Sequence, residues 1–81
     1  MDESKERQLA WINSNPLRKW RTTNKKTLSE VAPSLKLGYH RVHEIETGKG
    51  LPSKYQFQLL TALIHIDAKA AWSRWLKKRP T

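Results

Sequence analysis

The segment LGYHRVHEIETGKG, residues 37–50, concentrates the side chains best able to bind a ligand or catalyse a reaction. It contains two of the chain's three histidines, His40 and His43, with a tyrosine, an arginine and two glutamates. Such a group could bind a metal ion, transfer protons, or form hydrogen bonds with another molecule. On a helix that turns about 100° per residue, both histidines and Glu44 share the face opposite the apolar residues, and Tyr39 lies at its margin.

A metal site or a catalytic centre would need residues that this segment lacks. The zinc motif HExxH requires glutamate directly after the first histidine, whereas Arg41 follows His40 here. The third histidine, His65, is distant in the sequence, and the chain has no cysteine. No nucleophile is paired with a base, and no enclosed pocket is indicated. We therefore expect no metal, no cofactor and no enzymatic activity, which leaves a solvated polar face or a contact surface.

The length of 81 residues predicts a single small domain. Such a domain buries only about 60 % of its unfolded surface, so a binding module is easier to build than a deep enzyme cleft. The absence of cysteine excludes disulfide bonds and zinc knuckles. No apolar run reaches the ~20 residues of a membrane span, and the acidic start MDESKER is unlike a signal peptide. We expect a cytoplasmic protein with no membrane partner.

The charge of the chain indicates a polyanionic partner. Sixteen basic residues stand against seven acidic ones, which gives a formal net charge of +9. Three of the acids, Asp2, Glu3 and Glu6, lie in the first six residues, so the rest of the chain is more basic still. Nucleic acid is the commonest partner for such a small basic surface, and an anionic membrane is the less favoured alternative.

Capping signals divide the chain into short helices. The expected signals are Asn15 before Pro16, a capping box of Thr27 with Glu30, Gly48 as a C-terminal cap, a second box of Ser53 with Gln56, and Asp67. No period-two alternation persists, so we predict an all-α fold, a compact bundle of about five short helices. We expect a helical N-terminal extension in residues 1–14 and one domain in residues 15–81, which ends in a helix and a basic tail at residues 77–80.

Two helices joined by a tight turn, with the second ending at glycine, form a helix-turn-helix pattern. The segments LRKWR, TLSEVA and LKLGYHRVHEIETGKGLPS resemble the DNA-binding domain of the Cro and lambda-repressor-like (XRE-type) family. The resemblance runs from about Leu17 to Leu63 and is most specific from Val42 to Ser53.

Three residues depart from the family pattern. Lys36 and Gly38 stand where the family usually has glycine in the turn and serine or threonine at the cap. Pro33 lies inside the first motif helix and removes one of its hydrogen bonds. That helix is therefore either short and kinked, or displaced by one residue.

The resemblance implies roles for individual residues. The helix at about 39–47 would enter the DNA major groove and contact bases through Tyr39, His40 and Glu44, with Arg41 and His43 on either side. Arg41 could equally contact a phosphate. The residues expected to contact phosphates are Lys25, Lys26, Thr27, Lys49 and Lys54. The family often pairs the positions of Arg21 and Glu46 as a partly buried ion pair.

The four tryptophans divide between core and interface. We expect Trp20 and Trp72 in the core, and Trp11 to dock the N-terminal segment on the core or on a partner. Trp75 with Leu76 is the candidate dimer interface, because exposed aromatic patches mark contact surfaces.

The resemblance therefore implies a bacterial, phage or plasmid transcription regulator. It would bind a palindromic operator in double-stranded DNA as a homodimer and act as a repressor, with no small-molecule ligand. The alternative is an antitoxin-like or regulatory module that uses this scaffold mainly to bind a protein. In that case Trp11, Trp72 and Trp75 would contact the partner.

Overall fold

The computed structural model describes residues 3–80, and within them the fold is all-α, as predicted. The elements are α1 (Glu3–Asn13), α2 (Pro16–Thr23), α3 (Leu28–Val31), the 3-10 helix η1 (Ala32–Leu35), α4 (Tyr39–Thr47), α5 (Lys54–Ile64) and α6 (Ala68–Lys77). The helix expected within residues 1–14 is therefore present as α1. The described chain is elongated, with principal extents of 35 × 23 × 20 Å.

Local capping sets most of the helix boundaries. Asn15 Oδ1 accepts hydrogen bonds from the backbone N–H groups of Leu17 and Arg18 at the start of α2. Both predicted capping boxes are formed, at the starts of α3 and α5, and the Asp67 side chain caps α6. Gly48 ends α4 at a φ of 80°, a backbone conformation that glycine adopts without a steric penalty. These boundaries confirm the prediction from the sequence.

Pro33 shortens the first helix of the predicted motif. The α-helical hydrogen bonds of α3 stop at Val31, and the chain continues as η1 with Pro33 in its first turn. A proline has no N–H to donate to the preceding turn, so the tighter 3-10 geometry replaces another α-helical turn. Lys36 then adopts a left-handed conformation with φ 55° and turns the chain towards α4. The helix is short and changes geometry, which was the first of the two alternatives.

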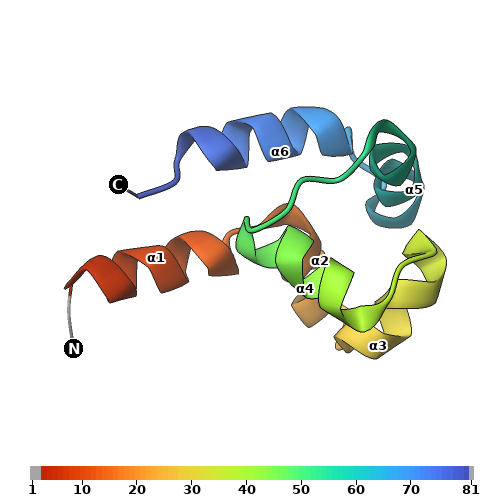
Figure 1. Ribbon diagram of the computed structural model, residues 1–81, viewed down its shortest axis with the longest axis horizontal. Coiled ribbons are helices and arrows are strands. Elements are labelled where there is room, and N and C mark those ends of the chain that lie inside the picture. The colour runs from red at the N-terminus through yellow and green to blue at the C-terminus, as the bar shows by residue number, and fades with distance from the viewer. Residues whose placement is uncertain (1–2, 81) are drawn as a thin grey trace.

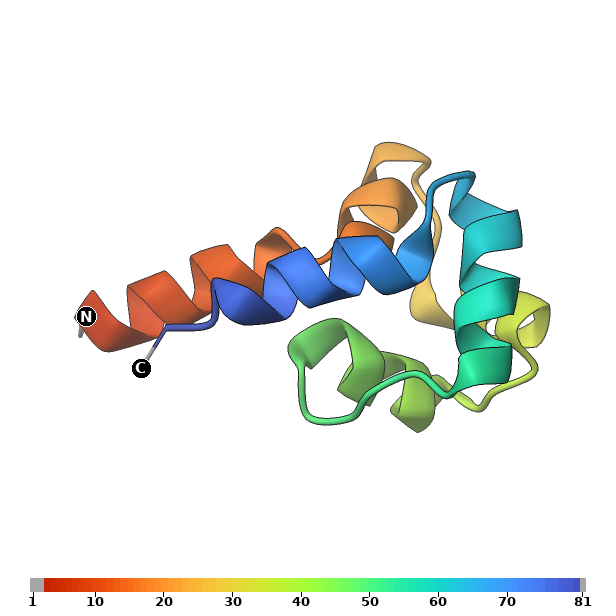
Figure 2. The same ribbon diagram turned by 90° about the horizontal axis from the view of Figure 1, so that it is seen from above.

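The core lies among α2, α3, η1, α4, α5 and α6, which Figures 1 and 2 show gathered at one end of the molecule. Its buried side chains come from every one of these elements: Leu17, Val31, Ala32, Leu35, Val42, Ile45, Leu60, Ile64, Ala68 and Trp72. Val42 and Ile45, on the inner face of α4, are fully buried in the core. The outward face of α4 is therefore the side available for contacts.

At the other end, α1 and the C-terminal half of α6 extend together away from these helices (Figures 1 and 2). The rings of Trp11 and Trp75 stack with their centroids 4.0 Å apart and an interplanar angle of 3°. Each indole Nε1 donates a 2.7 Å hydrogen bond to the backbone oxygen of the other tryptophan. This reciprocal pair, which we call the tryptophan clasp, joins the first helix to the last.

Candidate nucleic-acid interface

The outward face of α4 presents the polar residues that helical periodicity predicted there. His40, His43 and Glu44 are exposed, and Tyr39 is 50 % exposed and makes an edge-to-face contact with the His40 ring. The face therefore combines imidazole and hydroxyl donors with one carboxylate acceptor. These are groups that can form hydrogen bonds to base edges.

Arg41 does not share this face. Its Nη2 donates a 2.8 Å hydrogen bond to the backbone oxygen of Leu51, and the guanidinium lies against Gly50. The side chain thus holds the loop between α4 and α5, which corrects the expectation that it lies among the base-contacting residues. A glycine at position 50 leaves room for this contact, because a Cβ there would collide with the guanidinium.

The expected phosphate-contacting residues lie in two loops beside α4. Lys25 and Lys26 are exposed between α2 and α3, and Lys49 and Lys54 are exposed on either side of the loop after α4. The Thr27 hydroxyl oxygen accepts from the Glu30 N–H at 3.1 Å as the cap of α3. Both loops carry exposed lysines, and Lys49 directly follows the C-terminal end of α4.

The predicted ion pair between Arg21 and Glu46 is present and is buried on the carboxylate side. Arg21 Nε lies 2.8 Å from Glu46 Oε2, and Arg21 Nη2 lies 3.0 Å from Glu46 Oε1. Glu46 is 0 % exposed, and its hydrogen bonds to Arg21 raise the pKa of the guanidinium above its ordinary value, against the effect of burial. Arg21 also donates to the backbone oxygen of Lys26 at 3.0 Å, so one side chain ties the lysine loop to α4.

The sequence did not assign two further residues that fix α4. Arg18 Nη1 lies 3.7 Å from Glu46 Oε1, and Asn15 Nδ2 donates to the backbone oxygen of Ile45 at 3.5 Å. Arg18 precedes Arg21 by three residues, a spacing that places both on one helix face and could have indicated its role. Asn15 was identified as a cap only, since nothing local shows that a buried cap also reaches another helix.

Lys36 and Tyr55 form another contact that the sequence did not reveal. The Lys36 ammonium lies 5.6 Å from the centre of the Tyr55 ring, and a hydrogen bond with the Tyr55 side chain raises the pKa of Lys36. Tyr55 is 51 % exposed in the first turn of α5. A lysine paired with an exposed phenol adds a further donor at the turn before α4.

The interface prediction for Trp75 and Leu76 needs correction, whereas Trp72 lies in the core and Trp11 docks α1 on it, as expected. Trp75 is only 4 % exposed because it packs against Trp11, so it presents no aromatic surface for a dimer, and Leu76 beside it is half-buried against the core. Trp11 and Trp72 are also buried, at 4 % and 1 % exposed, so none of the three can contact a protein partner. Large indole surfaces pair with one another inside this chain instead.

The C-terminal segment is not the loose basic tail that its composition suggested. Lys77 ends α6, and the Arg79 guanidinium lies 4.6 Å from the centre of the Trp11 ring. Arg79 also donates a hydrogen bond to the backbone oxygen of Gly48 at the end of α4. The segment therefore connects the tryptophan clasp to the candidate interface.

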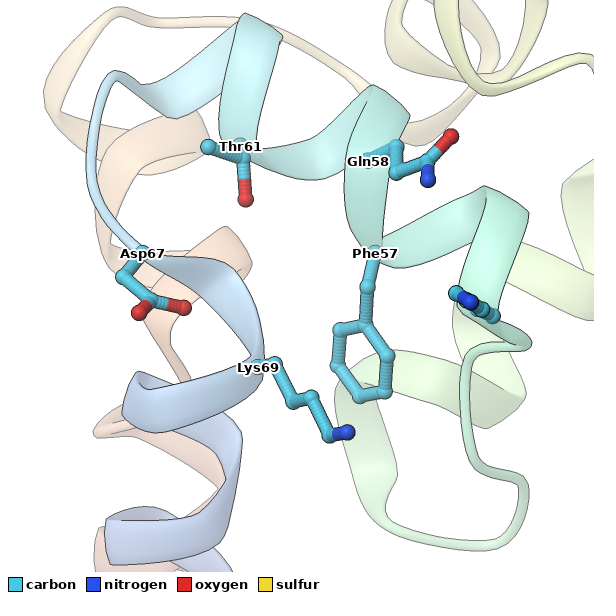
Figure 3. A pocket seen from close by; sticks show the side chains of 6 residues that line it. Phe57, Gln58, Thr61, Asp67 and Lys69 are labelled. Atoms are coloured by element: carbon cyan, nitrogen blue, oxygen red, sulfur yellow. The ribbon is translucent and has the colours of Figure 1, made fainter.

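An open hollow lies between α5 and α6 (Figure 3). Phe57 and Lys69 point towards one another across it, with Gln58, Thr61 and Asp67 around them. The Asp67 carboxylate and the Thr61 hydroxyl accept hydrogen bonds from backbone N–H groups at the start of α6. Its polar groups thus stabilise a helix end, and the hollow has no paired acid and base for catalysis.

In residues 3–80, no three His, Asp or Glu side chains are grouped so that they could hold a metal ion. Over the same range, no helix has the length and apolar character needed to cross a bilayer.

Comparison with known proteins adds no family to these observations. No family model matches the chain, and neither a curated protein nor a solved structure shows significant similarity to it.

Proposed function

We propose that this chain is a sequence-specific double-stranded DNA-binding regulator that inserts α4 into the major groove. The observation that carries the proposal is the contrast between the two sides of α4. Its inner side is fixed by buried Val42, Ile45 and Glu46, and its outer side presents exposed His40, His43 and Glu44. A rigid helix with exposed donors and acceptors is the arrangement by which helix-turn-helix proteins read base edges.

The chemistry of the outer face suits bases better than phosphates. Histidine donates to guanine N7 or O6, and a carboxylate accepts from cytosine N4. Phosphates would repel the Glu44 carboxylate, so its place on the exposed face favours a contact with a base. Such a contact would also disfavour operator sequences that present the wrong base to the carboxylate. The lysines in the two flanking loops are placed to neutralise the backbone, and the net charge of +9 supports that role.

We further propose that two copies bind an inverted repeat in the cytoplasm and repress transcription by blocking polymerase. One recognition helix covers only a few base pairs, so specificity requires a second half-site about 10 base pairs away. The protein-binding alternative is less favoured, because the three tryptophans assigned to its partner are buried.

Selection of bound sites from random duplexes tests this function. The expected result is a palindrome whose half-sites are about one helical turn apart. Recovery of sequences with no shared preference, at an affinity that depends only on salt, would show a non-specific DNA-binding protein. No retained duplex at all would remove DNA as the partner.

A further inference from the structure

The helix α1 has almost no buried surface to hold it in place. Of its 11 residues only Trp11 is buried, residues 3–7 are all exposed, and Leu9 is 51 % exposed. Isolated helices of this length are marginal in water and depend on packing against other elements. A projecting helix with one buried side chain therefore suggests a contact that a single copy does not supply.

A basic groove runs beside the base of α1. One hollow lies between α1 and the C-terminal segment, a second lies between α2 and α6, and both include Ser14 and Lys78. We call these two hollows together the arm groove. Its charged lining residues are Arg7, Lys19, Arg74, Lys78 and Arg79. Its floor is partly apolar, with Ala10 in one hollow and Ile66, which is 48 % exposed, in the other.

The acidic side chains that could complement this groove lie on α1 itself. Most carboxylates in the described chain already have a structural or surface role: Glu46 is in the buried ion pair, Glu30 and Asp67 cap helices, and Glu44 lies on α4. Glu3 and Glu6 are exposed in the first turn of α1. Glu3 lies 3.8 Å from Arg7 with both side chains mostly in solvent, and such a pair is weak.

We propose that the arm groove binds α1 of a second copy, antiparallel to the first, so that two copies exchange the same contact. A two-fold axis near Ala10 would place Glu6 of the partner copy beside Ser14 and Lys78. Glu3 of the partner copy, one turn further along, would then lie towards Arg74 and Lys19. Because the contact is two-fold symmetric, the acidic first turn of α1 in each copy lies in the basic arm groove of the other copy.

The length of α1 limits the contact to about 16 Å, the span of its 11 residues. Ala10 is exposed on the side of α1 that lines the groove, and its small side chain lets two helices approach closely. The contact is polar at its rim and small, so association should be salt-dependent and strengthened when both copies bind one duplex.

This inference deepens the proposed function, since it identifies the surface through which the two DNA-bound copies meet. Its first two tests are made without DNA, so that the two proposals can fail separately.

Single-cysteine variants test the two-fold contact directly, because the chain has no cysteine of its own. Ala10→Cys should form disulfide-linked dimers under mild oxidation at least several-fold faster than Ala62→Cys, its matched control on the exposed side of α5. Circular dichroism would check that both variants fold. Equal rates of cross-linking, or faster cross-linking of the control, would overturn the proposal.

Charge exchange tests which side chains meet. Glu3→Lys with Glu6→Lys should weaken self-association in sedimentation equilibrium by roughly ten-fold, because the two-fold axis repeats each exposed ion pair. Adding Arg74→Glu and Lys78→Glu to the same chain should restore it, whereas Lys69→Glu, on α6 outside the groove, should change little. The proposal would be overturned if the quadruple variant did not recover self-association. It would also be overturned if the wild-type chain stayed monomeric at every accessible concentration.

Binding to a duplex with one half-site separates this result from the proposed function. The Glu3→Lys, Glu6→Lys variant should bind one half-site at least as well as the unaltered chain, since α4 is untouched. A dimer that binds no DNA would leave the contact standing and remove the proposed function. Sequence-specific binding by a chain that never dimerises would do the reverse.

Discussion

At the scale of single residues, Glu46 determines how α4 is held. Its carboxylate is fully buried, accepts two hydrogen bonds from Arg21, and has Arg18 as a second cation at 3.7 Å. Burying both charges costs much of what their attraction returns, so the pair contributes orientation more than net stability. The geometry of this ion pair matters because the exposed polar residues of α4 lie on the opposite face of the same helical turns as Glu46.

Arg21→Met should destabilise the fold more than Arg21→Met combined with Glu46→Leu. The single change leaves a buried carboxylate without its main partner, which typically costs about 3–5 kcal/mol, whereas removing both charges is close to neutral. Urea unfolding of both variants and of Glu46→Leu alone completes the cycle. If the single and double variants lose equal, small amounts, the pair has no energetic coupling.

His40→Ala and Glu44→Ala should each lose about 1–3 kcal/mol of binding to the selected operator and relax its preference at one base pair. Lys49→Ala should weaken operator and scrambled duplex alike and reduce the salt slope by about one unit. Lys5→Ala, which removes the same charge from α1, is the control. Equal losses for both duplexes in the His40 and Glu44 variants would mean that α4 holds the backbone and reads no sequence.

At the scale of elements, the short helix α3 depends on its cap more than on its length. Four residues cannot sustain a helix alone, and the box formed by Thr27 and Glu30 satisfies two backbone donors at its start. The backbone and side-chain hydrogen bonds with Thr27 lower the pKa of Glu30 below its ordinary value of 4.5, with a smaller contribution from Lys26.

Because the folded-state pKa of Glu30 is lowered, its contribution to stability is complete above the unfolded value and is lost as the pH falls through the folded one. The unaltered chain should therefore lose more stability than Glu30→Gln between about pH 5 and pH 3. The amide oxygen keeps the bond to Thr27 N–H without titrating. Thermal unfolding at several pH values measures the difference, and parallel curves would show that the carboxylate adds nothing.

Gly48→Ala should destabilise the chain by about 1–3 kcal/mol, because φ is positive there and a Cβ would collide with Trp11 and the Arg79 guanidinium. Gly38→Ala is the matched control, since it lies at the other end of α4 with a φ of −81° and no atom within 4 Å of the added Cβ. Chemical denaturation compares them. Similar losses in both would show that the close packing at the end of α4 is unimportant.

At the scale of the whole molecule, local signals predicted more than distant ones. The caps at Asn15, Thr27, Ser53 and Gly48 were all read correctly, because each depends on residues within four positions. The partner of Glu46 is 25 residues away and was assigned only through a family resemblance. The exposed face of α4 followed from helical periodicity alone.

The contacts that the sequence could not predict join segments far apart. Trp75 was assigned to an interface because nothing near it indicates a partner 64 residues earlier. Arg41 was placed beside the base-contacting residues through the family resemblance, although its long side chain reaches back to the loop at Leu51. Helical phase locates a Cβ and leaves the end of a flexible side chain undetermined.

The tryptophan clasp also sets the order in which a nascent chain can complete its structure. Trp11 leaves the ribosome early, but its stacking and hydrogen-bonding partner is the seventy-fifth residue, and Arg79, which covers its ring, comes later still. Until Trp75 has been synthesised, the Trp11 indole stays uncovered and α1 lacks this packing contact. A product that terminates before Trp75 would expose this aromatic surface to chaperones and proteases, so the clasp distinguishes chains that include α6 from chains that stop before it.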